Sequence, residues 1–203
     1  MPLKEQLLPL IGCALIAYLA GALNLSILAA NIVGLNNLRT TGSGNPGATN
    51  LFRAAGAKVA VPVLILEILK AAAAINLPVL VGLSALKPLV VLPYLIGNLF
   101  PVFHGFKGGK GVAAVVGAML GASPPVMLLG GVVFLVLFAL FRRVSVGSLS
   151  MVIAYPVWGL VLRESALFVG VSCAVAAIVA TTHRANIVRI LNRTEPRLER
   201  RKG

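Results

Sequence analysis

The sequence contains no aspartate, and glutamate supplies all five of its acidic residues. This absence excludes a Ser-His-Asp triad, an aspartate-anchored magnesium site and a calcium-binding EF-hand loop. Lys and Arg number 18, so the formal net charge is +13. Any functional site must therefore be built from Glu, His, Ser, Thr, Asn, Lys, Arg and backbone amides. Such a set suits an anionic substrate and predicts no metal or other cofactor.

Charged residues of either sign are also scarce. They make up 11% of the chain, whereas an ordinary soluble domain has about 25%. Hydrophobic residues make up 59%, and so few charges cannot cover a soluble globule, so the apolar surplus must face lipid. The two cysteines, Cys13 and Cys173, lie in apolar stretches and indicate packing residues, not a disulfide framework or metal site. The composition predicts an integral membrane protein.

Seven apolar runs are candidate membrane-spanning helices, because about 20 apolar residues cross the hydrocarbon core. They cover residues 7–33, 57–84, 89–104, 112–127, 127–141, 149–162 and 166–182. The first run lacks the cleavage pattern of a signal peptide and is expected to be retained. We therefore predict an all-α fold of seven transmembrane helices in a single domain of residues 1–203.

Basic residues predict the orientation of these helices, because they concentrate in cytoplasmic loops. Lys4, Lys87 and Arg163 fall on one side of the membrane, and nearly all the others fall on the opposite side. The N-terminus is therefore expected outside and the C-terminus in the cytoplasm. The tail, residues 184–203, predicts contact with anionic lipid headgroups; its basic residues are Arg184, Arg189, Arg193, Arg197, Arg200, Arg201 and Lys202. Nucleic acid is not an expected partner, because the charges lie in short loops between apolar runs.

Three loops rich in glycine, serine and basic residues share the cytoplasmic side in this topology. They are residues 39–53, 104–111 and 142–148, and the start of the tail at 183–186 lies with them. Irregular backbone near a membrane face is tolerated where it is buried in protein or lines a wet cavity. We predict one polar pocket at the inner surface.

The first loop formally matches the dinucleotide pattern G-x-G-x-x-G at Gly42, Gly44 and Gly47. That fingerprint requires a preceding strand, and here a membrane span precedes it. The loop instead offers backbone N–H groups that can surround an anion. Its side-chain donors are Ser43, Asn45, Thr49, Asn50 and Arg53. These groups favour a phosphate cradle, with a tight interhelical turn as the alternative.

The second loop is similar to a phosphate-binding P-loop, but His104 stands where the first glycine of that motif is required. Gly111 replaces the Ser or Thr that would hold magnesium, so no NTPase is predicted. Four glycines still surround Lys107 and Lys110, which favours an anion site over a merely flexible basic loop.

Two further pairs of polar residues complete the candidates. Ser145 and Ser148 are three apart and can share one helical face, although Ser148 is also a candidate helix cap. His183 and Asn186 lie where the last span leaves the membrane and are candidate donors to a substrate. Within the second span, Glu67 and Lys70 are expected to pair with each other. The small residues Ala113, Gly117 and Gly121 predict close helix packing.

Taken together, these motifs closely resemble the bacterial acyl-phosphate-dependent glycerol-3-phosphate acyltransferase family, PlsY. The resemblance is carried by GSGNPGATN at 42–50, FPVF at 100–103, FKGGKGVA at 106–113 and HRAN at 183–186. These segments occur in the family's order and span nearly the whole chain. The sequence departs from the residues common in the family at five positions, namely Asn37, Glu67, Asn98, Thr182 and Ala185.

The resemblance implies transfer of a fatty acyl group from acyl phosphate to the sn-1 hydroxyl of glycerol 3-phosphate. The products are lysophosphatidic acid and phosphate, formed at the cytoplasmic face of the bacterial inner membrane. The implied catalytic residues are Ser43, Lys110 and His183. The implied binding residues are Gly42, Gly44, Asn45, Thr49, Asn50, Arg53, Lys107, Gly108, Gly109, Ser145, Ser148 and Asn186. We expect a monomer with a functional link to the enzyme that makes acyl phosphate.

The chemistry agrees with this implication. An acyl phosphate carries a good leaving group, so catalysis mainly requires bringing two anions together and stabilising the developing oxyanion. The His-x₄-Asp base of another acyltransferase class is absent, because Gly109 and Val188 stand five residues after the two histidines. A substrate phosphate is the predicted proton acceptor, with Ser43 or His183 as the alternative relay. An anion or phospholipid transporter is the alternative function, but the chain shows no internal repeat with matching interruptions.

Overall fold

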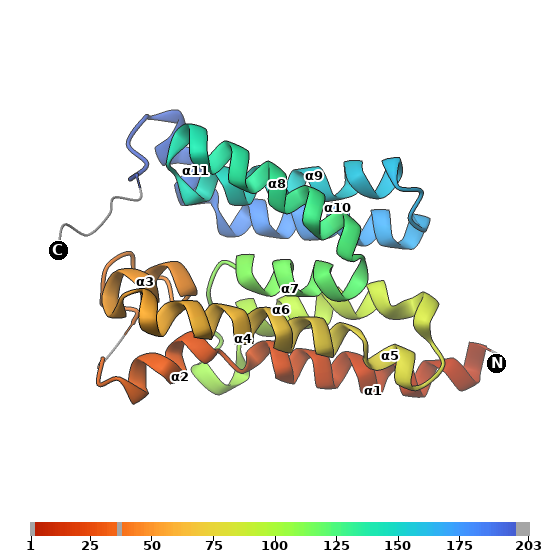
Figure 1. Ribbon diagram of the computed structural model, residues 1–203. Coiled ribbons are helices and arrows are strands. Elements are labelled where there is room, and N and C mark those ends of the chain that lie inside the picture. The colour runs from red at the N-terminus through yellow and green to blue at the C-terminus, as the bar shows by residue number, and fades with distance from the viewer. Residues whose placement is uncertain (1–2, 36–37, 198–203) are drawn as a thin grey trace. The chain divides into compact units, whose positions relative to one another are not determined.

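Helices account for most of the residues that the computed structural model describes, 3–35 and 38–197, and no strand occurs among them (Figure 1). The chain divides at Ser123 and Pro124 into two units, Met1–Ser123 and Pro124–Gly203. The departure Asn37 and the tail residues Arg200, Arg201 and Lys202 lie outside the described residues.

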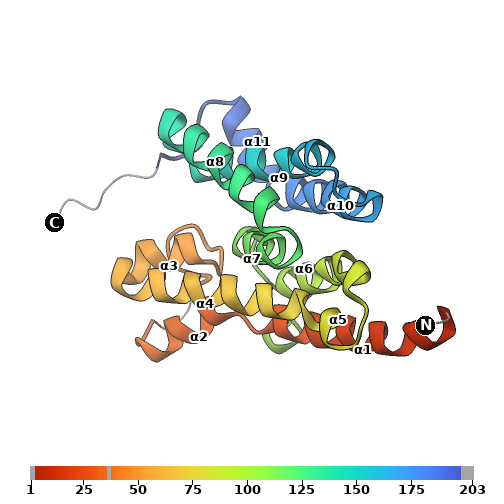
Figure 2. The same ribbon diagram turned by 45° about the vertical axis from the view of Figure 1, so that its right-hand side comes forward.

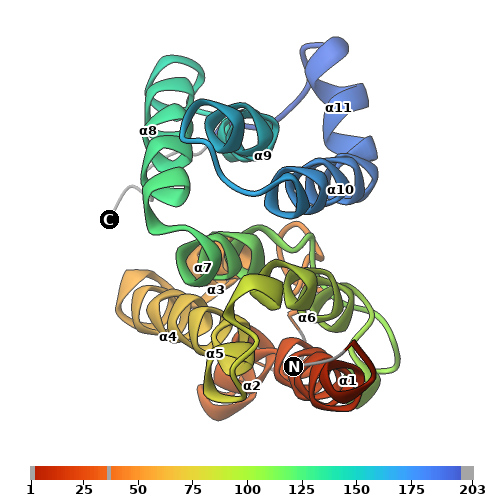
Figure 3. The ribbon, with the colours of Figure 1, turned by 90° about the vertical axis from the view of Figure 1, so that its right-hand side faces the viewer.

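The first unit is built on four helices that run side by side: α1 (Leu3–Ala22), α4 (Ala57–Ile75), α6 (Val91–Leu99) and α7 (Val112–Ala122), seen nearly end-on in Figure 3. Shorter segments connect them. These are α2 (Leu25–Ile32), α3 (Ala48–Ala55), α5 (Leu77–Leu80) and the 3₁₀ helices η1 (Ser84–Val90) and η2 (Val102–His104). Figure 2 shows α3 lying beside the start of α4, to which Gly56 joins it.

Glycines allow the helices of this unit to pack closely. A Cβ at Gly117 would collide with Ile68 and Ala71 of α4, and one at Gly121 would lie 3.0 Å from the Ala72 Cα. The prediction of close packing at these two positions is confirmed. A second contact was not foreseen: a Cβ at Gly97 of α6 would collide with the Tyr18 carbonyl of α1.

The second unit contains α8 (Pro124–Phe141), α9 (Val144–Val161), α10 (Ala166–Thr182) and α11 (Arg184–Leu191). Close packing again depends on glycine, because a Cβ at Gly147 of α9 would lie 2.9 Å from the Phe134 ring of α8. Cys13 is buried as expected, but Cys173 of α10 is exposed, so its predicted packing role inside this unit is wrong. Position along an apolar helix alone does not tell which face a residue occupies.

Within the described residues, five helical stretches are long and apolar enough to cross a membrane, and α10 with α11, bent by 68°, makes a sixth if the pair is counted as one span. The helix α7 is apolar but has only 11 residues. Six of the seven predicted spans match these stretches with shifted ends, whereas the fourth, 112–127, corresponds only to the short α7. The fifth begins at Pro124 and not at 127, because proline is tolerated in a first helical turn. The sixth begins at Val144 and not at 149, and the first is interrupted between Ala22 and Leu25.

Two side chains of α4, which belongs to the second span, stabilise the interruption in the first span. The Glu67 carboxylate of α4 accepts a hydrogen bond from the Leu25 N–H at 2.6 Å, and Lys70 donates to the Leu23 carbonyl. The two side chains also pair with each other, with 2.8 Å between Lys70 Nζ and Glu67 Oε2. The predicted pair is confirmed, and its members additionally satisfy backbone groups that the break leaves without helical partners.

Candidate active site

The first glycine-rich segment is part loop and part helix. The predicted loop of residues 39–53 is wrong in its second half, because α3 begins at Ala48 and places Thr49, Asn50 and Arg53 on a helix. The backbone of Gly42 and Gly44 is left-handed, with φ of +60° and +69°, which glycine adopts without strain. The Ser43 and Arg53 side chains are exposed, and Thr49 is half-buried.

Asn50 holds this loop in shape. Its side-chain oxygen accepts a hydrogen bond from the Ser43 N–H at 3.0 Å. Its amide nitrogen donates to the carbonyls of Leu38 and Thr41, both at 2.8 Å. A primary amide has two N–H groups, so both are used within the chain. Asn50 therefore orients the loop that presents Ser43.

Arg39 connects the first loop to the second. Its guanidinium Nη2 donates to the His104 carbonyl at 3.1 Å and to the Lys107 carbonyl. A Cβ at Gly109 would lie 3.7 Å from both Asn45 Oδ1 and the Pro46 carbonyl oxygen. The structure thus brings the first two predicted motifs together within one unit. Arg39 was not predicted to have this role, because carbonyl partners more than 60 residues away leave no local sequence signal.

Gly108 lies against the end of α6. Its N–H donates to the Leu99 carbonyl at 3.0 Å, and a Cβ there would be 2.7 Å from the Leu99 carbonyl carbon. Lys110 is half-buried, whereas Lys107 is exposed. Backbone contacts therefore hold the loop, and Lys107 and Lys110 give it positive charge.

Ser145 and Ser148 lie in the first turns of α9. The predicted loop of residues 142–148 is wrong beyond Arg143, because Arg143 is extended and the helix starts at Val144. Ser148 donates to the Val144 carbonyl at 2.9 Å, so it is not a helix cap. Both serines are buried.

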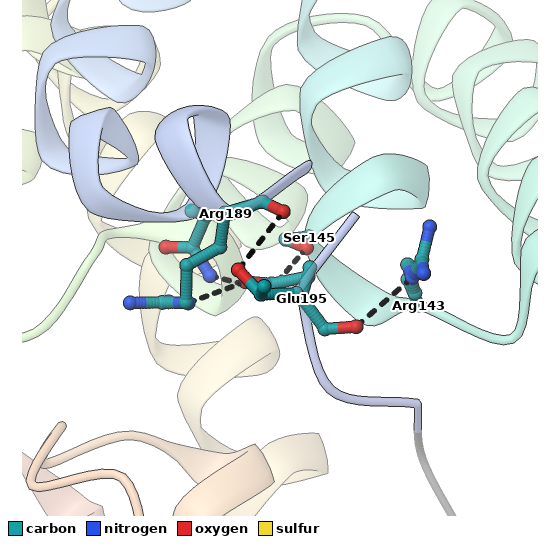
Figure 4. Close-up of polar contacts among 6 residues, drawn as sticks. Arg143, Ser145, Arg189 and Glu195 are labelled. Carbon is teal, nitrogen blue, oxygen red and sulfur yellow. Dashed lines mark hydrogen bonds and ion pairs between the residues drawn. The ribbon is translucent and has the colours of Figure 1, made fainter. Parts of the chain in front are cut away.

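Four groups converge on Glu195, which follows α11 (Figure 4). Its Oε1 accepts hydrogen bonds from Ser145 Oγ and Asn186 Nδ2, each at 2.6 Å. Its Oε2 pairs with Arg189 Nε at 2.7 Å, and its backbone carbonyl accepts from Arg143 Nε at 3.0 Å. The structure thus brings the predicted residues Ser145 and Asn186 onto one carboxylate. Glu195 was not among the predicted site residues, although an isolated acid in a basic tail is a usable signal.

His183 lies at the bend between α10 and α11 and is buried. Its Nδ1 is 2.9 Å from the Val179 carbonyl oxygen. A carbonyl can only accept, so Nδ1 carries the proton, and in the neutral ring Nε2 then carries the lone pair. This arrangement suits proton acceptance at Nε2.

The surroundings of Glu195 lower its pKa. Burial alone would raise the pKa of this carboxyl, but hydrogen bonds from Ser145, Asn186 and Arg189 together with the Arg189 charge outweigh it. A lowered pKa means that these contacts stabilise the fold above the unfolded-state pKa of about 4.3, and that the stabilisation is lost as pH falls through the lower folded value. We expect Glu195→Gln to lower Tm in detergent at pH 7, with the difference from wild type shrinking toward pH 3. A pH-independent difference would contradict this.

Comparison with known proteins decides the family. A family model described as glycerol-3-phosphate acyltransferase matches residues 11–193. The chain belongs to the glycerol-3-phosphate acyltransferase family. Among relatives of that name, the Dinoroseobacter shibae protein is 40% identical over 199 residues, covering 97% of this chain and 95% of its own. The Albidiferax ferrireducens protein is 36% identical over 202 residues, covering 93% and 88%.

Solved structures of the acyltransferase family support the same assignment. The crystal structure of PlsY, an integral membrane glycerol 3-phosphate acyltransferase, in its glycerol 3-phosphate form has a TM-score of 0.88 at 33% identity. Its lysophosphatidic acid form has a TM-score of 0.86 at 32% identity. Each likeness covers 93% of this chain and 95% of the PlsY chain. The resemblance to PlsY is confirmed, and this acyltransferase-family chain is a multi-pass membrane protein.

Proposed function

We propose that the chain transfers a fatty acyl group from acyl phosphate to the sn-1 hydroxyl of glycerol 3-phosphate, forming lysophosphatidic acid and phosphate. The supporting observation is the meeting of two glycine-rich, cationic loops, which Arg39 joins through the His104 and Lys107 carbonyls. The cations of these loops, among them the exposed Arg53 and Lys107, suit two phosphorylated substrates. The solved PlsY forms named for glycerol 3-phosphate and lysophosphatidic acid correspond to one substrate and the product.

The residues divide by role. We assign Lys110 to the developing negative charge, and Ser43 and His183 to the reacting hydroxyl. Direct phosphate contacts are assigned to Thr49, Arg53, Lys107 and Gly109, and substrate contacts in the second unit to Ser145, Ser148 and Asn186. Gly108 contributes to binding by holding the second loop against α6, because its N–H donates to the Leu99 carbonyl. Gly42, Gly44, Asn45 and Asn50 bind by shaping the first loop, a role that the three Asn50 hydrogen bonds support.

The proton of the attacking hydroxyl needs an acceptor. The bond between His183 Nδ1 and the Val179 carbonyl makes Nε2 a suitable relay. A substrate phosphate is the direct acceptor in our proposal, because it lies at the reacting atoms whenever both substrates are bound.

We further propose seven membrane crossings, with α7 counted as one, the N-terminus outside and the active site facing the cytoplasm from the bacterial inner membrane. The distribution of Lys and Arg supports this orientation. We expect a monomeric, single-domain enzyme, linked in function to the enzyme that produces acyl phosphate.

Phosphate release tests the reaction. Purified protein in lipid receives palmitoyl phosphate with or without glycerol 3-phosphate, and palmitoyl coenzyme A replaces palmitoyl phosphate in a parallel assay. We expect release only with both substrates, equimolar lysophosphatidic acid, and no product from the coenzyme A ester. Release without glycerol 3-phosphate would indicate a hydrolase, and equal use of the coenzyme A ester would refute the assigned donor.

Arg53→Ala should raise the KM for glycerol 3-phosphate about tenfold, because a charge-assisted contact to the phosphate is lost. The value of kcat should change little, since this contact is made in both the ground state and the transition state. Arg163→Ala, which removes another exposed arginine, is the matched control. An unchanged KM in the Arg53 variant would remove Arg53 from the substrate site.

A further inference from the structure

We propose that Asn24, in the break between α1 and α2, is a positioning residue of the acyltransferase site. Its side-chain amide donates to the Pro46 carbonyl of the first glycine-rich loop at 3.0 Å, across 22 residues of sequence. This inference rests on the proposed function. It gives the interruption of the first span a part in the reaction as well as in the fold.

The backbone on both sides of Asn24 is bonded to the second span. The preceding Leu23 carbonyl accepts a hydrogen bond from Lys70 of α4, and the following Leu25 N–H donates to Glu67 at 2.6 Å. Asn24 itself is only 4% exposed. A buried residue whose two neighbours are bonded to another helix has little freedom to move. Its side chain is therefore a rigid support for whatever it contacts.

The amide of Asn24 has a different partner at each end. Its Oδ1 accepts the Ile27 N–H at 3.0 Å, which caps the first turn of α2, and its Nδ2 donates to the Pro46 carbonyl. An N–H only donates and a carbonyl only accepts, so the amide cannot flip without losing both bonds. Aspartate also caps helices well, but an ionised aspartate offers no donor. The contact with the loop therefore accounts for an amide at this position.

Pro46 depends on this contact for its orientation. Proline has no N–H, so its carbonyl is the only backbone group that can hold it by a hydrogen bond. The Gly47 N–H, which belongs to the same peptide group, donates to the Asn45 carbonyl at 2.9 Å. Both polar groups of the planar peptide between Pro46 and Gly47 are thus engaged, and the orientation of that peptide is fixed.

This peptide lies at the junction of the two glycine-rich loops. Gly47 is the N-cap of α3, the helix that carries two of the proposed phosphate ligands and that packs against both α2 and α4 (Figure 2). A Cβ at Gly109 of the second loop would lie 3.7 Å from the Pro46 carbonyl oxygen. The oxygen that Asn24 holds therefore lies where α3 begins and where the second loop meets the first.

Loss of the Asn24 amide should shift the first loop relative to the second. The reaction requires two bound anions in a defined relative position, and a displacement of about 1 Å costs roughly 100-fold in rate. Arg53 reaches its phosphate through a long side chain with many rotamers, which can follow a small backbone shift. We therefore expect a lower kcat with only a small change in the KM for glycerol 3-phosphate.

Asn24→Ser tests the support while keeping a helix cap. Serine is a favourable N-cap residue, so α2 keeps its start, but the amide nitrogen that reaches Pro46 is gone. We expect kcat, measured as phosphate release at saturating palmitoyl phosphate and glycerol 3-phosphate, to fall about 10-fold to 100-fold. The KM for glycerol 3-phosphate should stay within about threefold.

Two further variants separate positioning from stability. Asn24→Ala removes the cap as well as the amide, so Tm in detergent should be lower than in Asn24→Ser, whereas kcat should be the same. Ser165→Ala is the matched control, because Ser165 caps α10 through the equivalent contact with the Phe168 N–H at 3.1 Å. It should lower Tm and leave kcat within about twofold. All rates are measured below the lowest Tm of the series.

The outcomes are distinguishable. A wild-type chain that forms no lysophosphatidic acid overturns the proposed function and this inference with it. An active wild type with kcat unchanged in Asn24→Ser overturns only the positioning role. A kcat that follows Tm through all three variants, Ser165→Ala included, overturns it as well, because general destabilisation then explains the loss.

Discussion

Replacing Lys110 with alanine should lower kcat about 100-fold to 1,000-fold, the usual cost of removing one group that stabilises a developing oxyanion. Lys110 belongs to the loop whose backbone is fixed by Arg39 and by the contact of Gly108 with Leu99. We expect the loss to fall on the transition state, and an unchanged Tm would show that the loop keeps its shape in the variant. Initial rates of phosphate release at saturating substrates give kcat directly.

Two comparisons sharpen this prediction. Lys58→Ala removes an exposed lysine at the start of α4 and should leave kcat within about twofold. Lys110→Arg should recover only part of the activity, because a planar guanidinium does not replace a compact ammonium charge. A wild-type kcat in Lys110→Ala would remove this residue from the chemistry.

Alanine at Gly109 should reduce kcat/KM about 100-fold without lowering Tm. A methyl group at this position would lie 3.7 Å from Asn45 Oδ1 and from the Pro46 carbonyl, which is ordinary contact, so the protein has room for it. A phosphate that approaches the Gly109 backbone would be displaced by the methyl group, and a displacement of about 1 Å costs roughly that factor.

Alanine at Gly108 should act differently. Its Cβ would lie 2.7 Å from the Leu99 carbonyl carbon, so the backbone of the loop must move. We expect a lower Tm as well as lost activity. Gly131→Ala, where a Cβ meets no atom within 4 Å, is the control. Normal kinetics in Gly109→Ala would show that no phosphate contacts Gly109, and an unchanged Tm in Gly108→Ala would contradict the packing argument.

The sequence predicted those features that depend on local composition or on helical spacing. Apolar length identified the membrane spans, and the three-residue spacing of Glu67 and Lys70 predicted their pairing. The start of α9 at Val144 was not predicted, because a short stretch of arginines and serines has the same composition in a loop as in a first helical turn. Only the backbone shows that Arg142, with φ of +57°, ends α8 and that α9 begins two residues later, at Val144.

Contacts between distant residues were beyond prediction. Asn50 has the chemistry of a phosphate ligand, but its partners Leu38, Thr41 and Ser43 show that it orients a loop. Glu195 was not predicted as a site residue, because nothing in its neighbourhood points to Ser145, 50 residues earlier. Residue type predicts what a side chain is able to bind, and the fold determines which partner it has.

The contacts of Glu67 and Lys70 with the break in the first span bear on how the chain enters the bilayer. Each of these charged residues opposes the insertion of an isolated helix, by about 2.5 to 3.5 kcal/mol for a lysine at the helix centre. The first span has the complementary defect, because Leu23 and Leu25 carry backbone groups that the break leaves unsatisfied. The charged side chains of α4 thus find partners in the backbone groups at the break, and those backbone groups are satisfied in return. The first span and α4 are therefore expected to leave the translocon together as a hairpin.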